Sequence, residues 1–412
     1  MKILWVKTGK LLPLNTGGKI RSFNILRQLS LRHEVTLLSY YAGKQDLDYE
    51  TELGKYFPHA VCYCTDIPDD ADGSIKRGIH YLSRVFHLVP YSVEKFTSAE
   101  VQRVVREWVT EGRFDVAVCD FLAASLNFPD VLTAPTVLFQ HNVEAKLWQR
   151  QARWERNWIK KAIFTLEAVK MARYEPAAVK KFDYVVAVSE SDRQSMLGAA
   201  PAGISVLPTG VDLREFQAVA GSRAVEPTVV FTGSMDWEAN IDAMEYFCEE
   251  IWPRVLAKLP TARFQIVGRN PHPRVKSLAS NSVEVTGTVP SIIDYLKGAS
   301  VVVVPLRIGG GTRLKIFEAM AMAKPVVSTS VGAEGLEVRH GHDIVLSDEP
   351  SDFAQWIIKL LGDETVRGKY GTAARETAGR YDWSTIATHF EGILTRLVRG
   401  YHPLEELVEV IS

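Results

Sequence analysis

Short runs of β-branched and other apolar residues alternate with helix-like patterns along the whole chain. In the first half we predict strands at Ile3–Val6, Val35–Ser39, Val116–Cys119, Thr136–Phe139 and Tyr184–Val188. In the second half we predict strands at Val229–Thr232, Phe264–Val267, Val283–Val285, Val301–Val304, Pro325–Ser328 and Ile344–Leu346. Strands that alternate with helices are typical of an α/β fold, in which helices cover both faces of parallel sheets.

A stretch rich in turn-forming residues, from Pro208-Thr209-Gly210 to Pro227, interrupts this pattern once. A chain of 412 residues also exceeds what one hydrophobic core usually supports. We therefore predict two Rossmann-like domains, residues 1–207 and 208–382, whose strand ends face each other across a ligand cleft. The C-terminal segment 383–412, with a helix over Trp383–Val398, is expected to pack back toward the N-terminal domain.

Composition and charge narrow the class of protein. With 46% hydrophobic and 24% charged residues, the chain resembles ordinary soluble globular proteins. Its net charge of −1 argues against a nucleic-acid binder, which normally carries a basic excess. Residues Met1–Lys7 enter a strand without the features of a signal peptide, and no apolar run approaches the roughly 20 residues that span a bilayer. We predict a cytoplasmic location.

The segment after the predicted strand Val301–Val304 is the most informative part of the sequence. It reads Gly309-Gly310-Gly311-Thr312-Arg313-Leu314-Lys315-Ile316-Phe317-Glu318 and opens a helical pattern. Glycines let the backbone approach a ligand closely, and the free N–H groups of a helix start attract an anion. Two cations stand at the same place and a carboxylate follows them. The segment predicts a site for a phosphorylated ligand whose other end carries hydroxyls.

A second glycine turn, Asn15-Thr16-Gly17-Gly18-Lys19, lies between the first strand and a predicted helix. It does not match the Gly-x-Gly-x-x-Gly of dinucleotide sites, and the chain has no Walker motif. The main sequence motifs that would indicate an NAD-dependent oxidoreductase or a P-loop ATPase are therefore absent.

His141 directly follows the predicted strand Thr136–Phe139. Residues at the carboxyl end of a parallel strand usually face the ligand crevice, where a histidine can hydrogen-bond a substrate hydroxyl. A histidine at this position can equally cap the next helix, and position alone favours neither interpretation.

The segment Lys146–Lys181 is strongly basic, with only Glu155, Glu167 and Glu175 opposing its cations. An apolar stripe recurs in it near helical spacing: Leu147, Trp154, Trp158, Ala162, Leu166 and Val169. Such a helix can lie on an anionic membrane surface, at the inner face of the membrane in a cytoplasmic protein. The stripe can also pack on the sheet and leave a solvated basic face. We favour packing, because every helix in this architecture needs an apolar face.

The block Gly309–Val327 resembles that of family 4 glycosyltransferases with the GT-B fold. Gly17-Gly18, Gln140-His141-Asn142-Val143-Glu144 and Pro208-Thr209-Gly210-Val211-Asp212 resemble that family's other landmarks, in the expected order. The resemblance spans about residues 1–398. It implies a retaining enzyme that uses a nucleotide-diphosphate sugar and needs no metal ion for the transfer.

The resemblance also implies roles for individual residues. Glu318 matches the glutamate that holds the donor ribose hydroxyls, and His141 matches the histidine near the transferred sugar. Gly17 and Gly18 match the loop beneath the diphosphate. The turn Thr286–Val289, with Thr288 and Val289, matches the backbone that meets the nucleobase.

The sequence departs from the family pattern at two places. Gly310 stands where relatives often have a second glutamate, and Thr232–Asn240 lacks the usual arginine and lysine. We expect Arg313 and Lys315 to replace those cations and to stabilise the charge on the leaving diphosphate. Glu334 offers a carboxylate from the next loop, although a solvated turn residue is the favoured interpretation.

The sequence predicts neither a metal site nor a cofactor. Asp46-Leu47-Asp48 and Asp70-Ala71-Asp72 match the Asp-x-Asp of metal-dependent transferases only superficially, because both lie in polar, loop-like stretches. Cys62 and Cys64 alone are too few ligands for zinc.

We therefore expect a glycosyltransferase that binds its donor through Gly309, Gly310, Gly311, Thr312 and Glu318, with His141, Arg313 and Lys315 in catalysis. Its acceptor is a glycan, a lipid-linked intermediate or a small molecule, and no nucleic acid takes part. One rival is a nucleotide-sugar epimerase or hydrolase on the same fold. Another is a sugar-nucleotide-binding protein without catalysis, which Gly310 and the missing cations suggest.

Overall fold

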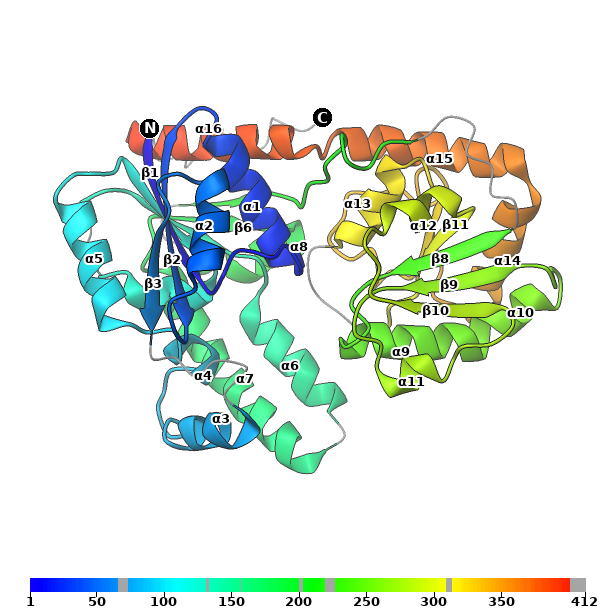
Figure 1. The fold of residues 1–412 in the computed structure, drawn as a ribbon, viewed down its shortest axis with the longest axis horizontal. Helices are drawn as coiled ribbons and strands as arrows, with labels where there is room; N and C mark the ends of the chain where they lie inside the picture. The colour runs from blue at the N-terminus through cyan, green and yellow to red at the C-terminus, as the bar shows by residue number, and fades with distance from the viewer. Residues whose placement is uncertain are drawn as a thin grey trace. The chain divides into compact units, whose positions relative to one another are not determined.

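The computed structural model describes residues 1–65, 73–130, 133–155, 157–199, 203–218, 227–308 and 313–400, with only the backbone for residues 73–77. The chain forms two compact units (Figure 1). The first comprises Met1–Pro208 and the chain from Ile386 onward, and the second comprises Thr209–Thr385. The unit boundary falls in the turn-rich stretch of the sequence, of which residues 219–226 lie outside the described residues.

The first unit is built on a seven-stranded parallel sheet with the order β3-β2-β1-β4-β5-β6-β7. Its strands are β1 (Lys2–Thr8), β2 (Glu34–Ala42), β3 (Val61–Thr65), β4 (Val116–Asp120), β5 (Thr136–Phe139), β6 (Tyr184–Ala187) and β7 (Ile204–Val206). The central strands are buried on both faces, which explains why β1 and β4 are apolar without alternation. The edge strands β3 and β7 are absent from the sequence prediction.

Helices connect these strands and cover the sheet. They are α1 (Gly17–Leu29), α2 (Leu47–Tyr56), α3 (Gly73–Leu82), α4 (Tyr91–Glu94), α5 (Ala99–Thr110), η1 (Leu122–Asn127), α6 (Glu144–Trp154), α7 (Trp158–Val179) and α8 (Glu190–Met196). Polar side chains start several of them: Thr16 caps α1, Ser98 caps α5 and Asn157 caps α7. These three helices therefore begin where the sequence supplies an acceptor for their free N–H groups.

The second unit contains a six-stranded parallel sheet with the order β10-β9-β8-β11-β12-β13. Its strands are β8 (Thr228–Thr232), β9 (Arg263–Val267), β10 (Val283–Gly287), β11 (Val301–Val304), β12 (Val326–Ser328) and β13 (Val345–Leu346). Its helices are α9 (Glu238–Tyr246), η2 (Phe247–Ile251), α10 (Trp252–Leu256), α11 (Pro273–Lys276), α12 (Ile293–Gly298), α13 (Leu314–Ala321), α14 (Pro350–Gly362) and α15 (Glu364–Gly379).

The last helix, α16 (Trp383–Val398), belongs to the first unit from Ile386 onward. Phe390 is fully buried there, with its ring centroid 5.8 Å from that of Trp5 and 5.2 Å from that of Phe139. Glu391 forms an ion pair with Arg32 at 2.6 Å. The end of the described chain thus completes the core beneath β1 and β5.

Helices α6 and α7 form an antiparallel hairpin in the first unit (Figure 1). The apolar stripe of this segment faces outward: Trp154, Trp158, Leu166 and Val169 are 55%, 77%, 39% and 48% exposed. The expectation that the stripe packs on the sheet is therefore wrong. The physical reason is that the buried face of α7 carries hydrogen-bonded charges, which include Glu167.

Glu167 is the clearest of these inward charges. It accepts the backbone N–H of Tyr91 at 2.7 Å and pairs with Lys170 at 3.1 Å. Contacts with other elements thus decide which face of α7 is buried. None of the helices in the described part of the chain is long and apolar enough to cross a membrane.

The Phe390→Ala substitution is expected to lower the free energy of unfolding of the first unit by about 3–5 kcal/mol, because it leaves a cavity between Trp5 and Phe139. Hydrogen exchange measured by mass spectrometry should show lost protection in β1, β4 and β5 but not in β8 and β9. His389→Ala, at an exposed neighbouring position of α16, is the control and should change stability by less than about 0.5 kcal/mol. Equal effects of the two substitutions would contradict the packing described.

Candidate functional site

The strand order of the first unit reverses between β1 and β4, and this point gathers charged residues. Ligands of open α/β sheets bind in the crevice at such a switch point, beyond the carboxyl ends of the strands. Lys7 lies near the end of β1, and Asp120 is the last residue of β4. Gly17 and Gly18 open α1, which follows β1 along the chain.

Asp120 is a fully buried carboxylate with three partners. Its oxygens accept hydrogen bonds from Trp5 Nε1 at 3.0 Å and Lys7 Nζ at 3.0 Å, and one lies 2.7 Å from His141 Nε2. Burial alone would raise the pKa of Asp120. The charge of Lys7 and the hydrogen bond with His141 outweigh that effect and hold the pKa well below its usual range. Asp120 is therefore ionised at neutral pH.

His141 lies against this carboxylate and is 1% exposed. Burial lowers the pKa of His141 to about 4, although Asp120 opposes the shift. The neutral ring donates from Nε2 to Asp120, which leaves Nδ1 as an acceptor. Nδ1 is buried and has no hydrogen-bond partner among the described residues. The ring thus presents an unused acceptor at the switch point.

His141 does not cap α6, the alternative that the sequence left open. The carboxylate of Glu175, on α7, accepts the N–H groups of Glu144 and Ala145 at 2.9 and 3.0 Å. It also accepts Gln140 Nε2 at 2.6 Å. One buried acid therefore caps α6 and fixes the residue before His141.

Phe121 explains why Gly18 has no side chain. Its backbone has a positive φ of 74°, and its ring stacks on His141 with centroids 3.7 Å apart and planes 3° apart. A Cβ on Gly18 would lie 2.4 Å from the Phe121 ring. Gly18 therefore permits the close approach of α1 to the aromatic pair, and a rare backbone conformation holds the ring in place.

Arg21, Lys7 and Asp120 are further charged residues at this point of the sheet that were not predicted from the sequence. Arg21 is fully buried; Nη1 donates to Gln140 O at 3.4 Å and Nη2 donates to Leu207 O. Burial lowers the pKa of Arg21 to about 9. A charged residue at the end of an apolar strand is the signal that could have identified Lys7 and Asp120, as it did His141.

The strand order of the second unit reverses between β8 and β11, which leads to α13. Gly309, Gly310, Gly311 and Thr312, predicted to bind the donor, lie outside the described residues. Arg313 precedes α13 in the left-handed conformation, with φ of 51°, and is 8% exposed. Its Nη2 lies 3.5 Å from Glu334 Oε2. Glu334 is therefore not merely a solvated turn residue, because it contacts this cation.

Lys315, in the first turn of α13, lies against the end of β8. Its Nζ donates to Asn240 Oδ1 at 3.1 Å and stands 4.0 Å from the Phe231 ring centroid. A Cβ on Gly233 would lie 2.9 Å from Nζ. Burial, helped by the charge of Arg313, lowers the pKa of Lys315 to about 7. The side-chain nitrogen of Lys315 therefore lies against the segment Thr232–Asn240, which has no lysine or arginine of its own.

Glu318 lies one turn further along α13 and is half-buried. Burial raises the pKa of Glu318 to about 7, with Glu215 adding to the shift and Lys315 opposing it. An acid and a base with shifted pKa values in one helix turn are typical of a ligand site. For both groups, burial outweighs the compensation that the neighbouring opposite charge provides.

Two further segments lie at the same edge of this sheet, because both follow its parallel strands. After β9, Arg269 donates from Nε to Ser234 Oγ at 3.0 Å; the sequence analysis did not identify this cation. Gly287, the last residue of β10, has a positive φ of 71°, and after it Thr288 is exposed and Val289 is half-buried. Strands β8, β9 and β10 are neighbours, so these turns and Lys315 share one edge.

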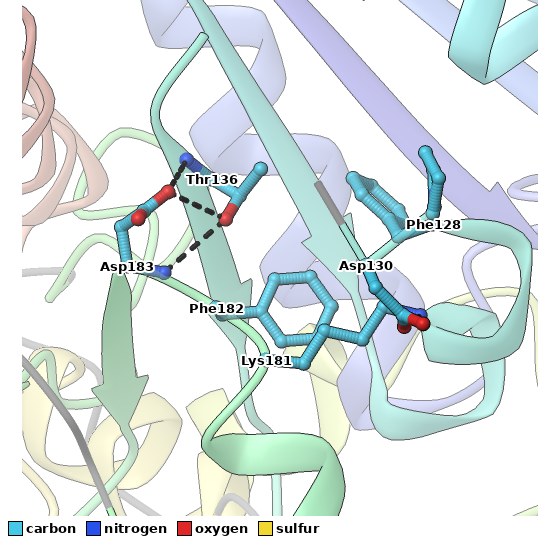
Figure 2. Close-up of a pocket in the computed structure, with 7 residues that line it drawn as sticks. Phe128, Asp130, Thr136, Lys181, Phe182 and Asp183 are labelled. Carbon is cyan, nitrogen blue, oxygen red and sulfur yellow. Dashed lines mark hydrogen bonds and ion pairs between the residues drawn. The ribbon is translucent and has the colours of Figure 1, made fainter. Parts of the chain in front are cut away.

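A pocket of about 190 Å³ lies at the opposite edge of the first sheet, where β5 and β6 begin (Figure 2). In it the Asp183 carboxylate accepts the N–H and the hydroxyl of Thr136, both at 2.8 Å. Lys181 pairs with Asp130 at 3.2 Å. These polar groups satisfy each other and tie the starts of two strands, which indicates a structural role.

In the described residues, no group of three or more His, Cys, Asp or Glu side chains is arranged to hold a metal ion. Asp46 caps α2 and pairs with Lys10 at 2.6 Å, so it has a structural role. Asp70 and Asp72 lie outside the described residues.

Two family models match the chain. Residues 17–215 match the model described as Glycosyltransferase Family 4, and residues 226–363 match that of Glycosyl transferases group 1. The chain belongs to the family 4 glycosyltransferases. The enzyme class predicted from the sequence is confirmed.

Curated relatives of this glycosyltransferase are distant. An uncharacterized 44.6 kDa protein in the cps region of Klebsiella pneumoniae is 22% identical over 87% of this chain and 90% of its own length. A phosphatidyl-myo-inositol mannosyltransferase of Mycobacterium leprae is 27% identical over 49% of this chain and 56% of its own length.

Solved structures confirm the GT-B fold of this glycosyltransferase. The sucrose-phosphate synthase of Thermosynechococcus elongatus matches with a TM-score of 0.70 and 17% identity, over 97% of this chain and 100% of its own. The Anabaena Alr3699/HepE protein in complex with UDP and glucose matches with a TM-score of 0.64 and 16% identity, over 96% and 99%.

We expect Asp120→Asn to lower kcat of this glycosyltransferase by about 100-fold, with a smaller change in the donor KM. An amide neither balances the charge of Lys7 nor fixes the proton on Nε2 of His141. Nitrogen-15 NMR of the ring should show a larger share of the Nδ1–H tautomer. Asp115→Asn, at an exposed position just before β4, is the matched control. A folded Asp120→Asn enzyme with unchanged kcat and tautomer would exclude this positioning role.

Proposed function

We propose that this glycosyltransferase moves a sugar from a nucleotide-diphosphate donor to an acceptor in glycan or glycoconjugate biosynthesis, with retention and without a metal ion. The observation that carries the proposal is the pair of Lys315 and Glu318 in the first turns of α13, at the switch point of the second unit. The pKa values of both groups are shifted to about 7. A ligand with an anionic part and a hydroxyl-bearing part complements this pair.

The diphosphate is proposed to bind at the start of α13. The helix N-terminus favours an anion, and Lys315 adds an ammonium beside Asn240 and Gly233. Arg313, just before α13, and Arg269, after β9, are two further cations at this edge, which makes three with Lys315. These cations supply charge that a metal ion supplies in other transferases. The family resemblance extends the same site to the triple-glycine segment.

The nucleoside is proposed to bind further along the same edge of the sheet. Glu318, when ionised, accepts hydrogen bonds from the ribose hydroxyls. The turn with Thr288 and Val289, after β10, offers backbone groups to the base. These roles rest on the family resemblance, and the partial exposure of Thr288 and Val289 leaves them accessible to a ligand.

The acceptor is proposed to bind to the first unit near His141. Nδ1 of His141 can accept a hydrogen bond from a sugar hydroxyl, and Asp120 holds the ring in the matching tautomer. Gly17 and Gly18 belong beneath the diphosphate, as the resemblance implies. As the diphosphate departs, a hydroxyl attacks from the same face of the sugar and a donor phosphate oxygen takes its proton. The stereochemistry of the anomeric carbon is then retained.

The comparisons support the substrate classes. The Anabaena protein has been crystallised with UDP and glucose, and the mycobacterial relative is named for transfer of mannose to phosphatidyl-myo-inositol. A lipid-linked acceptor is therefore one of the acceptors to test, beside a glycan and a small molecule. The cytoplasmic location stays a prediction.

A nucleotide-release assay over a panel of nucleotide sugars, with and without polyprenyl-linked acceptors, tests this function. Release that depends on an acceptor, with a glycosylated product of retained anomeric configuration, is the expected result. A sugar isomer formed without nucleotide release would identify an epimerase. Binding without any turnover would identify a non-catalytic protein.

Two substitutions are expected to separate binding from turnover. Glu318→Ala should weaken donor binding, because it removes the acceptor for the ribose hydroxyls. Arg313→Ala should lower kcat by about 100-fold if its charge stabilises the leaving diphosphate. Glu376→Ala, at an exposed position of α15, is the control for loss of a carboxylate from the same unit. Unchanged kinetics in folded Glu318→Ala and Arg313→Ala enzymes would refute the site.

Donor affinity is expected to fall as the pH rises above about 7. The pKa of Lys315 lies at about 7 in the free protein, so its ammonium loses its proton in this range. A bound diphosphate stabilises the charged form and raises that pKa, so binding takes up a proton and weakens by up to about tenfold per pH unit. Isothermal titration calorimetry in buffers of different ionisation enthalpy measures this uptake.

Lys315→Arg is the matched variant for this pH dependence, because a guanidinium stays charged over the whole range. Above about pH 7 the variant should bind the donor without proton uptake and without a fall in affinity. The same fall in both proteins would assign the titration to a group other than Lys315 and would contradict this role.

A further inference from the structure

Exposed large apolar side chains are concentrated in one part of the first unit. Of the fifteen such side chains among the described residues, nine belong to the α6–α7 hairpin or to α3 and the turn after it. Monomeric proteins rarely expose contiguous apolar surface, and a concentration of this kind marks an interaction site. We call these two segments together the hairpin surface.

The hairpin contributes the first part of this surface. Trp158 and Ile159, at the start of α7, are 77% and 52% exposed. Further along α7, Leu166 and Val169 lie on the same outward face, because residues three and four apart share one face of a helix. Trp154, at the end of α6, is exposed as well.

Helix α3 and the following turn contribute the second part. Ile79 and Leu82 are 64% and 65% exposed, and Phe86 and Leu88 are 93% and 83% exposed. This segment lies beside α7 (Figure 1), where Tyr81 Oη lies 3.4 Å from the inward carboxylate of Glu167. Both segments are thus anchored to the same buried acid and carry their apolar side chains outward.

The exposed charges of the hairpin are of one sign. Arg153, Lys160, Lys161, Arg173 and Lys180 are exposed in the described part of the hairpin. Its acids are not: Glu167 and Glu175 are buried, while Glu144 and Glu155 are only half-exposed. A partner for this face must therefore be apolar inside and anionic at its boundary.

A groove of about 480 Å³ between α6 and α7 combines both properties. Its lining includes the small side chains of Ala152, Ala168 and Ala172. It also includes the cations Arg153, Lys161 and Arg173. Small apolar side chains and cations in one groove suit an aliphatic chain that carries a phosphate group.

We propose that the hairpin surface docks the first unit onto the surface of an anionic phospholipid bilayer. The apolar side chains of α3 and α7 enter the acyl boundary, and the tryptophans lie at the headgroup level. The cations of the hairpin bind lipid phosphates, which adds about fivefold in affinity for each cation near the surface. Docking does not depend on the donor chemistry. It places the enzyme where a lipid-linked acceptor would lie, if the proposed function includes one.

Co-sedimentation of the full chain with vesicles tests the proposal without any nucleotide. The chain should bind vesicles of phosphatidylglycerol and phosphatidylcholine at least about tenfold more tightly than vesicles of phosphatidylcholine alone. Added salt should weaken the binding to the anionic vesicles. Equal binding to both vesicles, or none to either, would overturn the proposal.

Paired variants locate the contact. Lys160→Glu with Lys161→Glu should weaken binding to anionic vesicles by about 30-fold or more. The control Arg27→Glu with Arg106→Glu makes the same change of net charge at exposed positions of α1 and α5, and should have little effect. Equal loss in both double variants would show attraction by net charge rather than docking by the hairpin.

The apolar part is tested separately with Trp158→Ser and Ile159→Ser, and with Phe86→Ser and Leu88→Ser. Each pair should weaken vesicle binding by at least about tenfold and leave nucleotide release with a soluble acceptor intact. Leu31→Ser, which changes a 74% exposed leucine outside the hairpin surface, is the matched control. A second copy of the chain could cover the same surface, and analytical ultracentrifugation tests for such a dimer. A wild-type dimer that the Trp158 and Ile159 variant abolishes, together with no vesicle binding by the wild type, would overturn the proposal.

Discussion

The buried carboxylate of Asp120 is the group on which the first half of the molecule depends. An isolated charge in a protein interior is very costly, and Asp120 is stable there only because Lys7, Trp5 and His141 surround it. These contacts join β1, β4 and the end of β5 at the point where the strand order reverses. The hydrogen bond with Asp120 also orients the ring of His141, whereas burial of the ring keeps it neutral. The stability of the sheet and the chemistry of its edge therefore rest on one ion cluster.

At the switch point of its own sheet, the second unit also has charged groups, but their charges are compensated differently. Lys315 and Glu318 are partly desolvated, and their pKa values move toward each other, because neither is fully compensated. In the first unit Lys7 and Asp120 form an ion pair, whereas in the second unit burial shifts the pKa values of Lys315 and Glu318 to about 7. A preformed, saturated cluster suits a residue that must hold its orientation. An unsaturated pair suits a site that binds and releases an anion.

Much of the fold follows from the sequence, because burial on both faces makes the central strands continuous apolar runs. The eleven predicted strands all exist, and α16 has the predicted bounds. The edge strands β3 and β7 were missed because β3 is half-exposed along its length and β7 has only three residues. The sheet order, and with it the switch points, comes from contacts that no local pattern contains.

Local patterns identified His141 and the start of α13 as candidate site residues, and their roles stay predictions. Asp120 and Lys7 each directly follow a predicted apolar strand, but that position does not show their pairing, which joins residues 113 positions apart. The prediction that the apolar stripe of α7 faces the sheet was wrong. Glu167 and Glu175 decide which face of the helix is buried, and their partners lie on other elements. Helical periodicity shows that a face is apolar, but not whether the protein covers it.

Glu175 connects the α6–α7 hairpin mechanically to the residue before His141. Its carboxylate accepts the first N–H groups of α6, and the oxygen that accepts the N–H of Glu144 also accepts the amide of Gln140, which precedes His141. The base of the hairpin and the histidine are thus separated by two hydrogen bonds and a peptide unit. A load on the hairpin cannot tilt α6 without stretching those bonds. A surface that the hairpin binds therefore also fixes the orientation of His141, because α6, Glu175 and Gln140 connect the two.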